Sequence, residues 1–505
     1  MKSGLTRRQL IKAGALVVAG SVVAACQPKV VEKIVEKEVT KIVQEIVKEV
    51  VKETVMVAGT PQVVEKEITK IVEKVVQVPV EEEIVLTYTS WGEVEQPGNP
   101  PDQFEKFFAD HPNIKIEAYG YPNYDEKLYL LMASGTMPDF FRTQDEPFVK
   151  NAARGIYKNL DALVDRDSAF FNKDDFYPGA WESFRYDPDT GVYGQGAQFC
   201  IPNTGGCLLW LVNKEVFADA GVDVPEENGL NWTLDDFVEI GLQIRELDAQ
   251  ERMTKGYYSW PGTVYNMPLI WTHGGEYLNE DYSKCLLGEP ESIKAHEWLY
   301  RIMHEWRLCP LAGGGEMTGM SWDELIISKK LAMQMGGPWN RLPLTDCEIE
   351  GFQEVWDIVH VPKNPDTGKR ATRTSWDGSA ISPQTEYVDE SWTAVKFMAD
   401  DWFIEQTLKA GAHGSSRIST AEGRYFEGNK ETPQHEEVFG QALREYSHLQ
   451  PITKFWGEMW DIIAYYYDNM FNPELKMPPA EACPEMAWHV NYLFENEEIS
   501  PKFGA

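Results

Sequence analysis

The sequence has few of the features that mark enzymes and metal proteins. Its nine histidines form no His-Glu-x-x-His pair, and it contains neither a phosphate-binding glycine loop nor a Gly-x-Ser-x-Gly segment. None of the seven cysteines stands in a Cys-x-x-Cys pair, so a zinc site is not expected. We expect no metal, no cofactor and no enzymatic activity. The 80 acidic residues still leave room for a chance pair of glycosidase carboxylates.

Basic residues are also scarce, since 47 lysines and arginines face 80 acids and the formal net charge is −33. Nucleic acids and anionic membrane surfaces bind proteins through basic patches, so neither is expected as a partner. After the N-terminus, no apolar run is long enough to cross a bilayer. This composition favours a soluble, mutually repelling surface outside the cell.

The first 26 residues read as an export signal. Arg7 and Arg8 precede an apolar run over residues 13–25, which is short for a membrane-spanning helix. The arginine pair resembles a twin-arginine signal, with Leu10 where that motif usually has phenylalanine. Val-Ala-Ala-Cys, ending at Cys26, resembles the lipobox whose cysteine becomes the lipidated first residue. An uncleaved signal anchor is the open alternative.

Residues 27–83 form a low-complexity segment rich in valine, glutamate and lysine. Apolar pairs recur every four residues between residues 30 and 51, and the pattern restarts at residue 63. A period of four is nearer to a helix than to a strand, although the β-branched residues weaken a helix. We predict a stalk, either a helical and self-associating one or a solvated tether, that holds the remainder off the membrane.

Six cysteines remain if Cys26 is lipidated. Cys200 and Cys207 flank Ile-Pro-Asn-Thr-Gly-Gly and lie close enough in the sequence to bridge a short loop. An oxidising compartment permits a disulfide, and buried free thiols are the alternative.

The roughly 420 residues from residue 84 onward are too many for one ordinary core and enough for two. Strands are predicted at residues 84–89, 114–118 and from 137 onward, with helices at 104–111 and 124–134 between them. This alternation predicts a parallel sheet, and ligands bind beyond the carboxyl ends of such strands. Trp91 and residues 143–145 are therefore expected beside a cleft.

Several segments in this region resemble motifs of one family. They are Ala-Ser-Gly-Thr-Met-Pro-Asp at 133–139, Leu-Val-Asn-Lys-Glu-Val-Phe at 211–217, Trp-Thr-Leu-Asp-Asp-Phe at 232–237, Gly-Gly-Pro-Trp at 336–339, Gly-Ser-Ala-Ile-Ser at 378–382 and Ser-Ser-Arg at 415–417. Their order resembles the extracellular solute-binding proteins of ABC importers, in the maltose-binding-protein-like, sugar-binding branch. Val212 and Ser415 depart from the usual tyrosine and proline.

The resemblance implies a two-lobed periplasmic-binding-protein-like α/β fold with discontinuous lobes. Lobe 1 is expected to comprise residues 84–202 and 373–413, and lobe 2 residues 203–372 and 414–505. The crossings are expected near residues 202–205, 370–373 and 412–415, where glycine and proline can absorb hinge rotation. The implied function is capture of a carbohydrate, expected to be an oligosaccharide, in a cleft between the lobes and its delivery to the importer's permease.

The candidate ligand-binding residues follow from sugar chemistry, because aromatic rings cover sugar C–H faces while carboxylates and amides bind hydroxyl groups. By resemblance, Trp339 is expected to stack on a sugar. Trp376 and Asp377 offer a ring and a carboxylate together. The remaining candidates are Trp91, Asp145, Trp271 and Arg417. The aromatic residues at 456, 460 and 465–467 recur at helical spacing and are expected to belong to the core.

Two other classes of protein stay open at this stage. A secreted polysaccharide-active enzyme would release products from oligosaccharides. A surface adhesion or sensory lipoprotein could share the fold without an importer.

Overall fold

The computed structural model describes residues 39–57, 60–78, 83–92, 104–259, 264–310, 319–341, 344, 351–409, 414–422 and 435–504. The chain divides into two compact units, residues 1–83 and residues 84–505. The export signal and Cys26 lie outside the described residues. No helix in the described ranges is long and apolar enough to span a bilayer.

The first unit contains an antiparallel hairpin, and the predicted helical stalk is wrong. Strand β1 (Val39–Val57) pairs along its whole length with β2 (Thr60–Val78), from Val39 opposite Val78 to Val57 opposite Thr60. Valine, isoleucine and threonine dominate this sequence, and their branched side chains favour extended backbone. The four-residue spacing suggested a helix, but the β-branched composition outweighs it.

The second unit is built around two sheets. The first sheet has the order β15 (Gly414–Ser415), β8 (Cys200–Cys207), β14 (Thr372–Ile381), β5 (Phe140–Gln144), β3 (Ile84–Trp91) and β4 (Ile114–Tyr121), and β16 (Ser447–His448) pairs with β14. Strands β5, β3 and β4 are parallel, as the strand–helix alternation predicts. In chain order, α2 (Glu105–Asp110) connects β3 to β4 and α3 (Tyr124–Ser134) connects β4 to β5, close to the predicted bounds of these helices.

The second sheet has the order β10 (Glu246–Leu247), β11 (Met253–Tyr258), β12 (Leu331–Gly336), β9 (Leu209–Asn213) and β13 (Trp356–Val359). A separate ribbon pairs β6 (Arg185–Tyr186) with β7 (Ala197–Gln198). Only Leu208 separates β8 of the first sheet from β9 of the second. The molecule therefore has two lobes whose sheets share one almost continuous stretch of chain.

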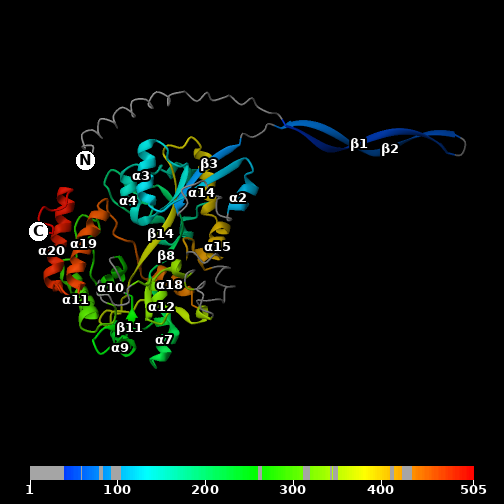
Figure 1. The fold of residues 1–505 in the computed structure, drawn as a ribbon. Helices are drawn as coiled ribbons and strands as arrows, with labels where there is room; N and C mark the ends of the chain where they lie inside the picture. Colours follow the sequence, from blue (N-terminus) through cyan, green and yellow to red (C-terminus); the bar gives the residue numbers. More distant parts are fainter. Residues whose placement is uncertain are drawn as a thin grey trace, which may run out of the picture. The chain divides into compact units, whose positions relative to one another are not determined.

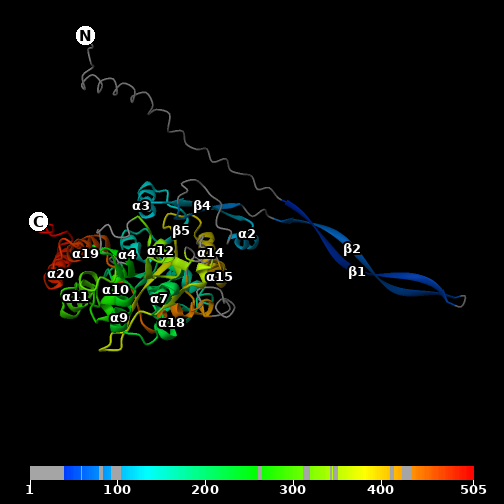
Figure 2. The same ribbon diagram turned by 60° about the horizontal axis from the view of Figure 1, so that its bottom comes forward.

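The remaining helices cover these sheets. They are α4 (Asp145–Ala153), α5 (Asp161–Arg166), η3 (Lys173–Asp175), α6 (Pro178–Glu182), α7 (Lys214–Asp219), α8 (Glu226–Gly229), α9 (Leu234–Ile244), η4 (Val264–Asn266), α10 (Met267–Thr272), α11 (Pro290–His304), α12 (Trp322–Ile327), η5 (Pro338–Asn340), η6 (Phe352–Glu354), α14 (Val388–Met398), α15 (Asp401–Lys409), α16 (Ile418–Ala421), α18 (Glu437–Glu445), α19 (Trp456–Phe471) and α20 (Pro479–Asn496). Helices α11, α19 and α20 pack together near the C-terminus (Figures 1 and 2).

Two apolar cores hold the lobes. The smaller core lies between the first sheet and helices α2, α5, α14 and α15. The larger core runs from α4 through the crossing strands to α20. It contains Trp456, Tyr466 and Tyr467, which confirms the core prediction for these aromatic residues, whereas Tyr465 is 41% exposed. The larger core thus spans both sheets and the segments that join them.

Candidate ligand-binding site

Trp91 is the last residue of β3 and lies at the carboxyl edge of the parallel strands, as predicted. It is half-buried. Its ring packs against Tyr124, with 4.9 Å between the ring centroids, and the Arg142 guanidinium lies 5.5 Å from it. These contacts fix the ring while leaving part of it exposed, which suits a surface for stacking.

Asp145 lies at the same edge, at the beginning of α4, but it is fully buried. Its carboxylate accepts the backbone N–H of Trp376 at 3.2 Å and the side-chain hydroxyl of Ser375 at 3.4 Å. Gln450 donates to it from the C-terminal segment at 3.4 Å. Burial, together with the neighbouring Glu146, raises the pKa of Asp145 to about 8. In this conformation Asp145 joins three segments of the chain rather than facing solvent.

Trp339 lies in the short helix η5, which follows the carboxyl end of strand β12 in the second sheet. The ring is half-buried and lies over Gly337, where an added Cβ would come within 2.4 Å of it. Asn340 accepts the Gly337 N–H at 3.2 Å and donates to Asp323 at 3.2 Å. The two glycines before Pro338 therefore let the chain turn tightly enough to place the tryptophan on its own backbone.

Trp376 and Asp377 do not form the joint ring-and-carboxylate pair that the sequence suggested. They are successive residues of strand β14, and successive side chains point to opposite faces of a sheet. Trp376 is fully buried and stacks on Tyr177 at 6.2 Å between centroids. Asp377 is 4% exposed and forms an ion pair with Arg142. Both residues have packing roles in this conformation.

Trp271 lies in α10 and is 8% exposed. Its ring stacks on His448, with 5.1 Å between centroids and 23° between the ring planes. Burial lowers the pKa of His448, which favours the neutral imidazole at this contact. Trp271 thus joins α10 to β16 and presents little surface to a ligand.

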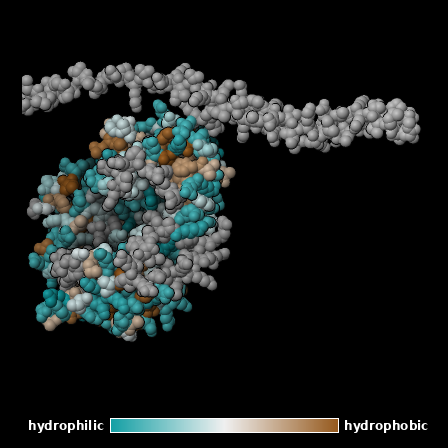
Figure 3. Space-filling model, turned by 45° about the vertical axis from the view of Figure 1, so that its right-hand side comes forward, coloured by the Kyte–Doolittle hydropathy of each residue, from teal (hydrophilic) through white to brown (hydrophobic). Residues whose placement is uncertain are grey.

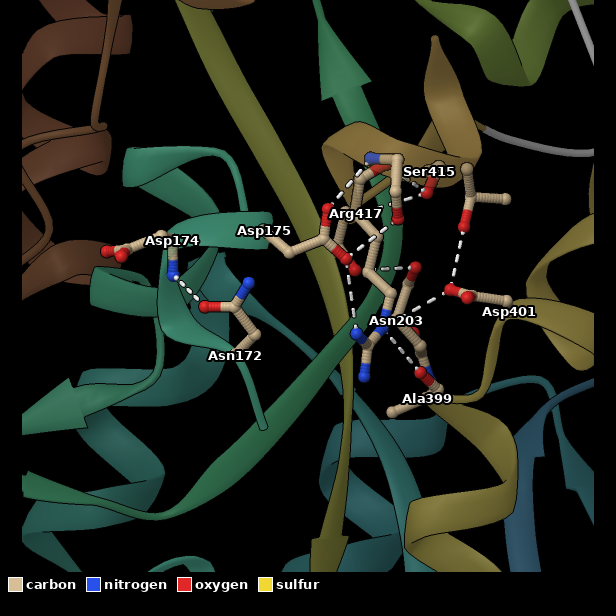
Figure 4. Close-up of polar contacts among 11 residues, drawn as sticks. Asn172, Asp174, Asp175, Asn203, Ala399, Asp401, Ser415 and Arg417 are labelled. Atoms are coloured by element: carbon tan, nitrogen blue, oxygen red, sulfur yellow. Dashed lines mark hydrogen bonds and ion pairs between the residues drawn. The ribbon is translucent and has the colours of Figure 1, made fainter. Parts of the chain in front are cut away.

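Arg417 is at the centre of a polar cluster that joins distant segments (Figure 4). It donates to the backbone carbonyl of Ala399 at 2.8 Å and to the Asp175 carboxylate at 3.3 Å. Its guanidinium lies 4.7 Å from the centre of the Phe176 ring. Arg417 is 6% exposed and bonded to these groups, so it links η3, the end of α14 and the start of α16.

The sequence analysis did not name one exposed tryptophan at the start of α12. Trp322, the first residue of α12, is 42% exposed. Residues 328–330 join α12 to β12. The next residue, Asp323, accepts hydrogen bonds from Gln334 at 2.6 Å and from Asn340 at 3.2 Å. These hydrogen bonds attach the start of α12 to β12 and to the turn that carries Trp339. None of the motifs in the sequence analysis included Trp322.

Of the two alternatives for Cys200 and Cys207, a disulfide or buried free thiols, the structure has the buried free thiols. The two cysteines are the first and last residues of β8. Seven steps along a strand separate their Cα atoms by about 23 Å, whereas a disulfide requires about 5.5–6 Å. Burial raises the pKa of both thiols.

The face of the molecule in Figure 3 is hollowed near its middle, and the described residues around the hollow are mostly hydrophilic. Among the described residues, no cluster of histidine, cysteine and acidic side chains is arranged to hold a metal ion.

Comparisons with known proteins agree with this architecture. An ABC substrate-binding protein of Listeria monocytogenes, solved in complex with cycloalternan, has a TM-score of 0.68 and 20% identity, covering 82% of this chain and all of that one. The cyclic α-maltosyl-1,6-maltose binding protein of Arthrobacter globiformis has a TM-score of 0.64 and 19% identity, covering 82% of this chain and 99% of that one.

A curated relative is the arabinooligosaccharide-binding protein of Halalkalibacterium halodurans, 22% identical over 284 residues. That alignment covers 55% of this chain and 59% of the relative's length. Residues 91–401, more than half of the chain, match the bacterial extracellular solute-binding protein family. On this match, and on a two-lobed fold shared with solved members of the same kind, the chain belongs to the bacterial extracellular solute-binding proteins.

Proposed function

We propose that this protein captures an oligosaccharide between its two lobes and delivers it to the permease of an ABC importer. The observation that carries the proposal is the position of partly exposed tryptophans at the strand ends of both sheets. Trp91 ends strand β3 of the first sheet, Trp339 follows the end of β12 in the second, and Trp322 begins the helix whose Asp323 bonds to Asn340. Rings on both lobes could cover sugar faces when the lobes close.

The relatives support the same ligand class. Their names describe binding of arabino-oligosaccharide, cycloalternan and a cyclic maltosyl-maltose, all of which contain several sugar units. Three tryptophans at the rim suit an extended ligand better than a single sugar, because each ring covers about one sugar unit. The relatives are binding proteins, which favours transport over catalysis.

A screen of oligosaccharides by thermal shift tests the ligand class. A ligand at 100 times its Kd stabilises the folded protein by about 2.7 kcal/mol. Malto-oligosaccharides, arabino-oligosaccharides and cyclic glucans form the panel. We expect stabilisation by at least one of them and no release of products. Hydrolysis of any member of the panel would replace the transport role with an enzymatic one.

Trp339→Ala tests the site itself. Loss of an aromatic contact costs about 0.5–1.5 kcal/mol beyond area burial, so we expect binding to weaken about ten- to a hundredfold when buried area is included. Calorimetric titration measures the affinity, and a melting curve checks the fold. The control is Trp488→Ala, which removes a more exposed tryptophan (46% exposed) from α20, outside both sheets. Unchanged affinity with a large drop in Tm would make Trp339 a packing residue.

We further propose that the protein is held at the outer face of the cytoplasmic membrane by lipid on Cys26, after export by the twin-arginine route. The family is extracellular, which supports the outer location. Two or more acyl chains give stable attachment where one is marginal. Cys26→Ser should release the protein from the membrane fraction, and replacing Arg7 and Arg8 by lysine should block export. Mature protein without lipid at Cys26 would refute the anchor, and undiminished export of the lysine variant would indicate the general secretory route.

A further inference from the structure

The turn that carries Trp339 is attached to elements outside its own sheet. Pro338 is buried, and its ring lies over two glycines of the first sheet. A Cβ added at Gly206 of β8 would lie 2.7 Å from the Pro338 Cγ atom, and one at Gly414 of β15 would lie 3.2 Å from the same atom. Ordinary van der Waals contact begins at 3.4 Å. The two positions therefore need glycine for Pro338 to lie where it does.

A second attachment follows Trp339 on the other side. Arg341 is 6% exposed, donates to the backbone carbonyl of Leu408 and forms an ion pair with Glu436. Leu408 belongs to α15, whose Phe403 packs in the smaller core with the first sheet. Glu436 is itself buried and directly precedes α18. A buried ion pair is costly to break by removing one partner, so this attachment is firm.

The two attached residues, Pro338 and Arg341, lie on either side of Trp339 in the chain. The turn begins at the end of β12, which belongs to the second sheet, but it rests at Pro338 and Arg341 on elements packed with the first sheet. Gly206 lies two residues before Leu208, where the chain passes from β8 to β9. The turn is thus attached beside one of the places where the chain passes between the two sheets. The ring therefore cannot move with the second lobe alone.

We propose that this turn, residues 336–341, couples lobe closure to the placement of Trp339, with Gly206 and Arg341 as positioning residues for ligand binding. The inference rests on the proposed function for its consequence in binding, but its structural part does not. A methyl group at position 206 must push Pro338 away by about 1 Å, because close-packed interiors transmit such displacements rather than absorb them. The Trp339 ring follows Pro338 directly in the chain and shifts with it.

Fluorine NMR of the full chain labelled with 5-fluorotryptophan tests the structural part without any ligand. The Trp339 signal is assigned by its loss in Trp339→Phe. We expect Gly206→Ala to shift that signal and to leave the Trp488 signal in place. The control is Gly457→Ala in α19, where an added Cβ meets only the Lys150 ammonium at 3.9 Å. An unmoved Trp339 signal in a folded Gly206→Ala variant would overturn the inference. Should that variant not fold, Glu436→Gln, which loosens Arg341, is judged by the same signal.

A double-mutant cycle with maltotriose tests the consequence for binding. We expect Gly206→Ala to weaken maltotriose binding about tenfold in the natural chain and less than twofold in the Trp339→Ala chain, since a residue that acts through Trp339 loses its effect without it. Equal losses in both chains would show that Gly206 acts independently and would overturn the coupling. If the natural chain does not bind maltotriose, the proposed ligand class is weakened, and the fluorine signal still decides the inference.

Discussion

Asp145 carries a proton at neutral pH because its surroundings exclude water. Its pKa in the folded protein is about 8, against 3.8 for an unperturbed aspartate. Between these values the folded state holds a proton that the unfolded chain releases, so the free energy of unfolding falls as the pH rises from about 4 to 8. Asp145→Asn removes this dependence. Because the folded state holds this proton over most of the interval and one unit corresponds to about 1.4 kcal/mol, we expect the variant to gain about 3–4 kcal/mol relative to the natural protein between pH 5 and pH 8.

Urea unfolding at pH 5, 6.5 and 8 measures this difference. The matched control is Asp223→Asn, which changes an exposed aspartate and should leave the pH dependence as it is. Parallel pH profiles for the natural protein and Asp145→Asn would show that Asp145 is ionised in the folded state.

The sequence predicts the place of a residue well where that place depends on its position in a strand. It predicts poorly whether other segments of the chain bury the side chain. Trp91 was placed correctly at a strand end because parallel strands finish at one edge. Trp376 was misjudged, since an aromatic residue beside an acid suggests a binding pair, but nothing in the sequence shows which face of β14 is covered by Tyr177. The burial of Asp145 was missed for a similar reason, because the groups around it come from β14 and from Gln450, hundreds of residues away.

At the scale of elements, the burial of both ends of β8 predicts how its two cysteines react. Cys200 and Cys207 are buried, and the thiolate, which is the reactive form, is suppressed by the raised pKa of each thiol. We expect neither residue to react with iodoacetamide in the folded protein, and both to react after unfolding in urea. Mass spectrometry of the alkylated peptides reads each cysteine separately. We also expect dithiothreitol to leave the Tm unchanged. A lowered Tm would indicate a disulfide.

Element prediction from the sequence was accurate for the parallel part of the first sheet. Strand β4 alternates in hydropathy over residues 114–118, and α3 ends at Gly135, whose φ of 70° is the left-handed conformation that glycine readily adopts. The hairpin of β1 and β2 was missed because its apolar pairs recur every four residues, which is nearer to the helical period of 3.6 than to the strand period of 2. The second sheet could not be derived in detail, since its strands are short and lie far apart in the sequence.

At the scale of the whole molecule, the proposed function requires the lobes to move. A ligand that binds better to the closed arrangement shifts the population towards it. Small-angle scattering of residues 84–505, with and without the tightest oligosaccharide of the screen, should show a smaller radius of gyration on binding. Omitting residues 1–83 keeps the hairpin from contributing to the signal. An unchanged profile at saturation would argue for a rigid site.

The strand order of the first sheet also bears on how the protein is made. Strand β14 lies between β8 and β5, yet it is synthesised after every strand of the second sheet. A ribosome that has completed residue 359 has supplied the whole second sheet, while the first still lacks its middle strand. Folding during synthesis usually proceeds from the N-terminus. Here we expect the reverse order: the lobe that the ribosome begins first is the last to acquire its native pairing.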